Sequence, residues 1–111
     1  MTSSEVTNLA HKYVYEVKNI LTEDFLSAVL YGSYARGDFN NDSDVDIAIF
    51  TNCSPKEYYQ LFEQIAELTF EFNAKYDVLI SPIFLNIHVY QENLSILPFY
   101  QNIEKEGIKV G

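Results

Sequence analysis

Two acidic residues, Asp44 and Asp46, stand at the start of a short apolar segment and could together bind a divalent cation. Side chains alternate between the two faces of a strand, so these carboxylates would share one face while Val45 and Ile47 point to the other. Two carboxylates at close range repel each other unless a cation lies between them. Hard oxygen ligands, completed by water and phosphate, suit Mg²⁺. The pair therefore predicts a magnesium clamp, although solvated loop acids would show the same spacing.

A third carboxylate, Asp77, lies in the apolar run of residues 76–80, which we expect to form a strand. Burying a carboxylate in such a run is unfavourable unless it has a partner. If this strand lies beside the one that begins at Val45, Asp44, Asp46 and Asp77 form a triad that can bridge two metal ions. That arrangement stabilises the attacking and leaving oxygens in phosphoryl-type displacement. The alternative is an exposed or structural acid.

Gly32, Ser33 and Arg36 precede the acidic pair and are suited to binding phosphate. A glycine lets a triphosphate approach the backbone, and a serine that opens a helical turn offers its hydroxyl and backbone N–H groups. Arg36, one turn later, can neutralise a phosphate that metal ions do not reach. It could equally form an ordinary surface ion pair with Asp38.

Two better-known motifs overlap this segment and are excluded by residues that do not fit them. Residues 32–37 begin like a Walker A loop, but Asp38 and Phe39 stand where lysine and serine or threonine are required. Residues 38–44 have the alternating acids of an EF-hand, but Ser43 replaces the required glycine and no glutamate closes the loop. Neither a P-loop nor a calcium sensor is expected.

Hydrophobic spacing predicts the elements that position these residues. Thr2 and Glu5 can form a capping box before a helix, and Ser54, Pro55 and Glu57 are typical of a second helix start. Helices are expected over residues 6–21, from residue 55 to near Asn73, and over residues 98–106. Strands are expected over residues 25–31, 45–50, 76–80 and, after a break at Pro82, 83–90. A loop with one helical turn is expected over residues 32–43. This order predicts one α/β (α+β) domain over residues 1–111, a small mixed β-sheet flanked by helices.

Composition excludes several function classes. A chain of 111 residues has the length of one domain, and 48% hydrophobic residues suffice for a packed core. A net charge of −9 argues against direct binding of nucleic acid. Cys53 has no partner for a disulfide, and the sequence shows no signal peptide or apolar span. We therefore expect a cytoplasmic protein with no membrane partner.

The spacing of residues 32–46 resembles the signature of the DNA polymerase β-like nucleotidyltransferase superfamily in its minimal (MNT) form. Ten residues separate Gly32-Ser33 from Asp44-Val45-Asp46, and residues 97–108 are similar to the tails of small bacterial members. The resemblance implies a polymerase β-like fold and transfer of a nucleoside monophosphate, such as AMP from ATP, to a hydroxyl. It also implies that Asp44 and Asp46 hold two Mg²⁺ ions and that Asp77 binds one of them and helps deprotonate the acceptor. Gly32, Ser33 and Arg36 would bind the triphosphate.

A chain of this size resembles the antitoxin of HEPN/MNT toxin–antitoxin pairs. That resemblance implies AMP transfer to a tyrosine of a partner HEPN ribonuclease toxin. Larger relatives that modify aminoglycosides append a helical acceptor domain, which disfavours the alternative of small-molecule transfer. A second alternative is an antitoxin that neutralises its partner by binding alone. Nine Tyr and eight Phe exceed what a core of this size needs, so some of them are expected at a partner interface; the candidates are Tyr15, Tyr34, Tyr59 and Tyr100.

Overall fold

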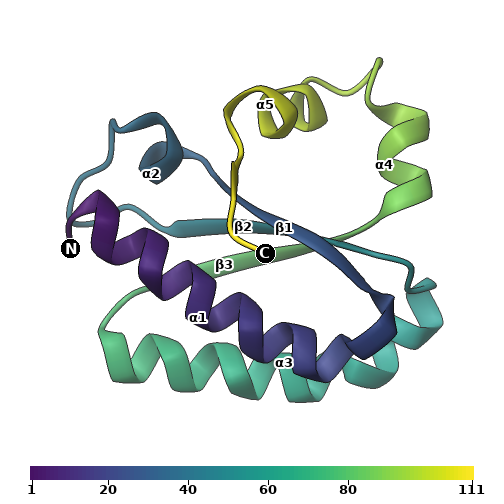
Figure 1. The fold of residues 1–111 in the computed structure, drawn as a ribbon, viewed down its shortest axis with the longest axis horizontal. Helices are drawn as coiled ribbons and strands as arrows, with labels where there is room; N and C mark the ends of the chain where they lie inside the picture. Colours follow the sequence, from purple (N-terminus) through teal and green to yellow (C-terminus); the bar gives the residue numbers. More distant parts are fainter.

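The computed structural model describes residues 1–111 and is built around a four-stranded mixed sheet with the order β3–β2–β1–β4 (Figure 1). The strands are β1 (Phe25–Tyr31), β2 (Val45–Thr51), β3 (Ile80–Asn86) and β4 (Ile108–Lys109). β1 pairs antiparallel with both β2 and β4, whereas β2 and β3 are parallel. The expected mixed sheet flanked by helices is confirmed.

Helices cover both faces of the sheet. They are α1 (Ser3–Leu21), α2 (Ser33–Arg36), α3 (Pro55–Tyr76), α4 (Ile87–Asn93) and α5 (Pro98–Glu106), with a short 3₁₀ turn, η1 (Thr22–Asp24), before β1. α1 and α3 lie below the strands in the view of Figure 1, and α4 and α5 lie above them. No helix combines the length and the apolar character that a membrane crossing requires.

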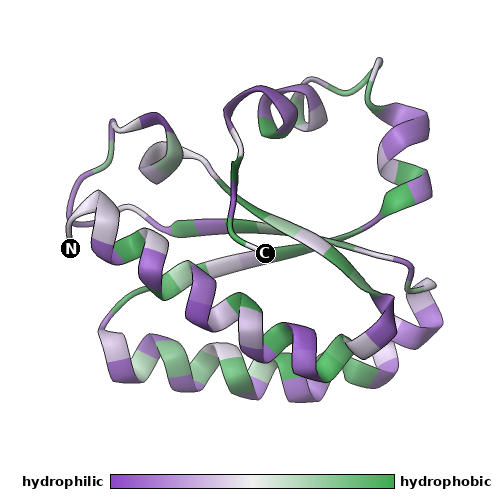
Figure 2. Ribbon diagram, viewed as in Figure 1, coloured by the Kyte–Doolittle hydropathy of each residue, from purple (hydrophilic) through white to green (hydrophobic).

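The hydrophobic residues of β2 divide between two clusters because successive side chains point to opposite faces. Ile47 and Ile49 belong to a cluster of 16 buried residues under α1 and α3. Ala48 and Phe50 belong to a cluster of five under α4 and α5. Figure 2 shows α1 and α3 banded in hydrophobic and hydrophilic colours, as amphipathic helices should be. Asp46 therefore lies on the face that carries α4 and α5.

The predicted capping boxes are confirmed at the starts of both long helices. Glu5 N–H donates to Thr2 Oγ1 at 3.1 Å, and Thr2 N–H donates to Glu5 Oε1 at 3.1 Å. Ser54 and Glu57 make the same reciprocal contacts, at 3.2 Å each. These local bonds satisfy backbone N–H groups that a helix start leaves unpaired, so they fix where α1 and α3 begin.

The end of α3 differs from the prediction. The helix continues past Asn73 to Tyr76, and Asp77 follows as its C-cap with φ 52°. A short polar side chain tolerates this left-handed conformation better than most residues do. Ile80 N–H donates to Asn73 Oδ1 at 2.9 Å, which ties the start of β3 to the end of the helix. The strand expected over residues 76–80 is therefore wrong.

Pro82 does not break the third strand, as it was expected to do. β3 is an edge strand, where a residue without an N–H group can be accommodated. The strand ends at Asn86, whose Oδ1 accepts hydrogen bonds from the N–H groups of His88 at 3.0 Å and Val89 at 3.2 Å. This cap starts α4, so the strand expected over residues 83–90 is replaced by a helix after Asn86.

The contact between α1 and α3 includes a buried hydroxyl whose contribution can be measured. Tyr13 is fully buried and its hydroxyl lies 2.8 Å from Thr69 Oγ1, which itself donates to the Ile65 carbonyl. We expect Tyr13→Phe to lower the free energy of unfolding by about 1 kcal/mol in urea titrations, because one net hydrogen bond is lost. The control Tyr15→Phe alters an exposed ring and should change nothing. Equal stability of the two variants would contradict the assignment.

Candidate active site

The candidate site lies where β1 ends and β2 begins, on the sheet face that carries α5. Tyr31, Asp46 and Ser81 are register partners across β1, β2 and β3. Partners of this kind project from the same face, so these three side chains form a row. The sequence analysis did not place Ser81 beside Asp46, because the third strand was expected to end at Ile80.

Gly32 brings the backbone against the Asp46 carboxylate. Its φ of 77° lies in the region that favours glycine. A Cβ atom at this position would collide with the Asp46 carboxylate, well inside van der Waals contact. A larger residue here would be strained at this φ and would have to displace the Asp46 carboxylate. This contact places the turn at Gly32 and Ser33 next to β2, the strand that carries Asp46.

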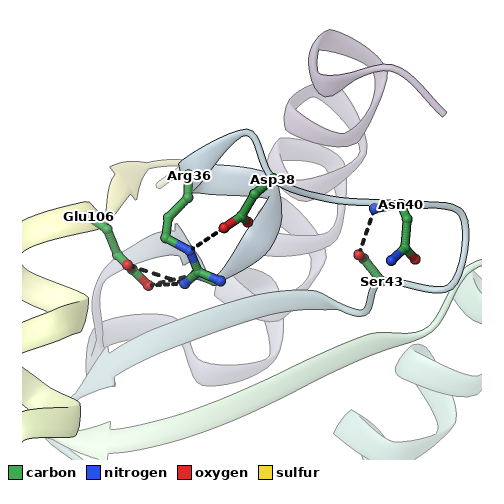
Figure 3. A network of polar contacts seen from close by, with 6 residues as sticks. Arg36, Asp38, Asn40, Ser43 and Glu106 are labelled. Atoms are coloured by element: carbon green, nitrogen blue, oxygen red, sulfur yellow. Dashed lines mark hydrogen bonds and ion pairs between the residues drawn. The ribbon is translucent and has the colours of Figure 1, made fainter.

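The loop between α2 and β2 is held by its own polar groups. Asn40 N–H donates to Ser43 Oγ at 2.9 Å (Figure 3). Ser43 N–H donates back to the Asn40 carbonyl at 3.1 Å. The next backbone link, from Val45 N–H to the Leu79 carbonyl at 2.8 Å, joins the loop end to the segment before β3. Asp44 lies between these two anchors.

Arg36 is paired with two carboxylates (Figure 3). Its Nε donates to Asp38 Oδ2 at 3.2 Å, which is the surface ion pair that the sequence left open. Its Nη1 also donates to Glu106, at 3.2 Å to Oε1 and 3.3 Å to Oε2. The hydrogen bond to Asp38 and then that to Glu106 raise the pKa of the guanidinium. Glu106 was not predicted as a site residue, since no local motif connects it with a residue 70 positions earlier.

Negative charge accumulates around Asp46. Partial burial and then the charge of Asp44 raise the pKa of the Asp46 carboxyl, while Arg36 acts in the opposite direction. Burial, followed by the charges of Asp46 and Glu106, raises the pKa of Tyr31 to about 12. These effects require the acids to lie close enough to interact. Their mutual repulsion is the kind that a bound cation relieves.

Asp77 does not complete the expected triad. It is an exposed C-cap residue of α3 and lies outside the row on the sheet. It does line, together with Asp44, a cavity of about 430 Å³ beside the loop. No group of three or more His, Cys, Asp or Glu side chains is placed to hold a metal ion. The triad fails because Asp77 ends a helix instead of extending a strand that pairs with β2.

The donor chemistry of Asp44 and Asp46 nevertheless fits Mg²⁺. This ion is commonly held by one or two carboxylates, with water and substrate phosphate completing its shell. Burial and then the charge of Asp44 raise the pKa of Asp46, so a cation bound beside these carboxylates would offset the cost of the Asp46 charge. Two carboxylates, a close backbone approach and an arginine are the parts from which a phosphate-handling site is built.

The fold and this site define a nucleotidyltransferase. Residues 14–110 match the family model described as "Nucleotidyltransferase domain", so the chain belongs to that family. The match covers most of the chain, which confirms both the predicted resemblance and the predicted enzyme class.

Curated relatives agree with this membership, and solved structures share the fold. The chain is 29% identical to "Putative protein adenylyltransferase MJ0141" of Methanocaldococcus jannaschii, over 96% of this chain and 99% of the relative. It is 30% identical to "Putative protein adenylyltransferase MJ1305" of the same organism, over 75% of this chain and 56% of that relative. The structure described as "Crystal structure of the toxin-antitoxin with AMP-PNP" aligns with a TM-score of 0.55 at 14% identity, covering 91% of this chain and 72% of the other. A structure of a mutant toxin–antitoxin MntA–HpeT aligns with the same TM-score at 13% identity and equal coverage. These structures show a shared fold.

Substitution of Gly32 tests the close approach to Asp46. We expect Gly32→Ala to lower the free energy of unfolding by roughly 2–4 kcal/mol, because backbone strain and a steric clash add. Gly37→Ala is the matched control: its φ is also positive, at 87°, but no atom lies within 4 Å of the added Cβ. That variant should lose only about 1 kcal/mol. Similar losses in chemical denaturation would show that the Asp46 contact is unimportant.

The raised pKa of Asp46 predicts that replacing this acid by a neutral residue stabilises the fold, and that the size of the effect depends on pH. A carboxyl whose pKa in the folded protein exceeds its ordinary value of 3.8 destabilises the fold once pH rises above that value. We expect Asp46→Asn to raise the melting temperature at pH 7 in EDTA by roughly 2–4 °C, and to lose this gain near pH 3. Asp24→Asn, at the opposite end of β1, controls for the loss of one negative charge. A gain independent of pH would contradict the prediction.

Proposed function

We propose that this chain transfers AMP from ATP to a tyrosine hydroxyl of a partner HEPN ribonuclease toxin and thereby acts as its antitoxin. The observation that carries the proposal is the contact of the Gly32 backbone with the Asp46 carboxylate, with Arg36 alongside. Family membership supports nucleotidyl transfer. The names of the curated relatives support AMP as the group transferred and a protein as its acceptor.

In the proposed reaction, the acceptor oxygen forms a bond to the α-phosphorus of ATP. The bond from that phosphorus to the oxygen bridging toward the β-phosphorus breaks, and pyrophosphate leaves with the bonding electron pair. Asp44 and Asp46 are the proposed ligands of Mg²⁺, two ions by the family resemblance, which would supply positive charge beside the phosphate oxygens. Gly32 N–H, the Ser33 hydroxyl and Arg36 would bind the triphosphate.

The hydroxyl proton needs a base on the acceptor side. Asp77 and Asp44 line the same cavity of about 430 Å³, which also reaches Tyr34 and Ser43. We assign Asp77 to this side, where its carboxylate takes the proton directly or through one water molecule. This role keeps the deprotonation that the family resemblance implies, without making Asp77 part of the metal site.

The surface supports a protein acceptor. Tyr59, Phe62 and Phe70 are 81%, 54% and 73% exposed on the outer side of α3. Large exposed aromatic side chains are enriched at protein interfaces. The net charge of −9 complements a basic, RNA-binding partner and would speed its association. Tyr15 is exposed as well, whereas Tyr34 is buried and stacked on Phe39.

The test is the intact mass of the HEPN partner after incubation with this protein, ATP and Mg²⁺. We expect the partner's mass to increase by whole AMP units, with the modified residue identified as tyrosine by fragmentation. Asp44→Asn and Asp46→Asn should each reduce the rate by about 100-fold or more, because each removes a negative ligand needed in the transition state. Asp24→Asn is the matched control and should retain full activity. Absence of any mass increase would refute the proposal.

A non-catalytic antitoxin is the second candidate, favoured by the missing third carboxylate at the metal site. The same variants separate the two functions. If Asp44→Asn and Asp46→Asn still bind and neutralise the toxin in cells, contact alone is sufficient. If they bind but no longer neutralise it, transfer is required. AMP transfer to an aminoglycoside in place of the partner would identify small-molecule transfer instead.

A further inference from the structure

Glu106 occupies the donors that the proposed function assigns to the triphosphate. Its Oε1 accepts a hydrogen bond from Gly32 N–H at 3.0 Å. The same oxygen accepts one from Arg36 Nη1 at 3.2 Å, and Oε2 lies 3.3 Å from that nitrogen. Figure 3 shows the Glu106 carboxylate directed at the Arg36 guanidinium. A backbone N–H and a guanidinium converging on one anionic group form an anion site.

The position of Glu106 is set by an anchored helix. It is the last residue of α5, and its side chain is only 19% exposed. Ile103, one turn earlier, is buried against the sheet in the cluster that contains Tyr90. The Tyr90 hydroxyl donates to the Tyr100 carbonyl at 3.2 Å and to Glu104 Oε2 at 2.8 Å. α5 is therefore held on the sheet and delivers Glu106 to the end of β1.

A carboxylate and a phosphate oxygen compete for such donors because both are anionic acceptors. They cannot share the Gly32 N–H and the Arg36 Nη1 without bringing two negative charges into contact. A triphosphate entering this site thus meets Glu106 as a competitor for its donors and as a repelling charge.

We propose that Glu106 is a determinant of nucleotide affinity, whose carboxylate must leave Gly32 and Arg36 before a triphosphate can bind there. The identity of the anion rests on the proposed function. The competition itself follows from the contacts of Glu106. Nucleotide occupancy is thereby coupled to the C-terminal end of α5, which lies far from Gly32 in sequence and beside it in the fold.

The decisive measurement is the affinity for ATP with Mg²⁺, by isothermal titration calorimetry of the full chain. Glu106→Gln keeps the size of the side chain but removes its charge. We expect this variant to bind ATP roughly tenfold more tightly, the size of effect expected when one charge-assisted competitor is removed. Glu92→Gln, an exposed position on α4, is the matched control and should bind ATP like the unmodified chain.

A second pair of variants tests whether the effect passes through Arg36. In an Arg36→Gln background, ATP should bind more weakly, and adding Glu106→Gln should improve affinity by clearly less than about tenfold, because one of the two shared donors is gone. The unmodified chain offers an independent readout. It has four glycines, so the Gly32 amide resonance can be assigned and should shift when ATP replaces the carboxylate.

Unchanged ATP binding by a folded Glu106→Gln variant would overturn the inference, and weaker ATP binding would overturn it by showing that Glu106 positions Arg36. A Gly32 amide resonance that does not shift when the unmodified chain binds ATP would overturn the inference as well. This second readout does not require the Glu106→Gln variant to fold. Tighter ATP binding without AMP transfer to the partner would refute the proposed function and leave this inference standing. If the protein transfers AMP to the partner but Glu106→Gln leaves its affinity for ATP unchanged, the proposed function stands and this inference is refuted. If neither chain binds ATP, the inference fails.

Discussion

The close approach of the Gly32 backbone to the Asp46 carboxylate is the constraint on which the site depends. The antiparallel register of β1 and β2 sets Tyr31 opposite Asp46, so the chain leaves β1 directly beside the acid. A side chain at residue 32 would be strained at its positive φ and would meet the Asp46 carboxylate. Glycine here serves a contact between segments, in addition to its freedom of φ.

The site is electrostatically unfavourable when considered alone. Asp44, Asp46 and Glu106 share a small region with one arginine, and burial adds to the cost of the Asp46 charge. Functional sites commonly keep such costs because the charges serve a ligand. In a nucleotidyltransferase the acids suit cations and the arginine suits phosphate, so each sign of charge has its own partner.

The buried core on both faces of the sheet offsets this cost. β2 is buried on both faces, between the clusters under α1 with α3 and under α4 with α5. The site lies at one end of this strand, where side chains reach solvent. The chain then returns after α5 to add β4 beside β1, and this return carries Glu106 to the turn at Gly32. The last part of the sequence thus completes a site begun near residue 32.

Local patterns in the sequence were sufficient to predict the capping boxes, the turn of helix after Gly32 and the two central strands. Each depends on hydrogen bonds or side-chain alternation within a few residues, which neighbouring residue types control directly. The spacing between Gly32-Ser33 and Asp44-Val45-Asp46 was sufficient to indicate the family. The placement of Asp77 was wrong because the helix continues to Tyr76 and ends at Asp77 in a left-handed cap, so β3 begins only at Ile80, whose N–H is bound by Asn73.

Only the tertiary structure placed Ser81 opposite Asp46 and Glu106 on Arg36. Strand register and the docking of α5 arise from the packing of whole faces, and such contacts leave no local pattern between residues that lie dozens of positions apart.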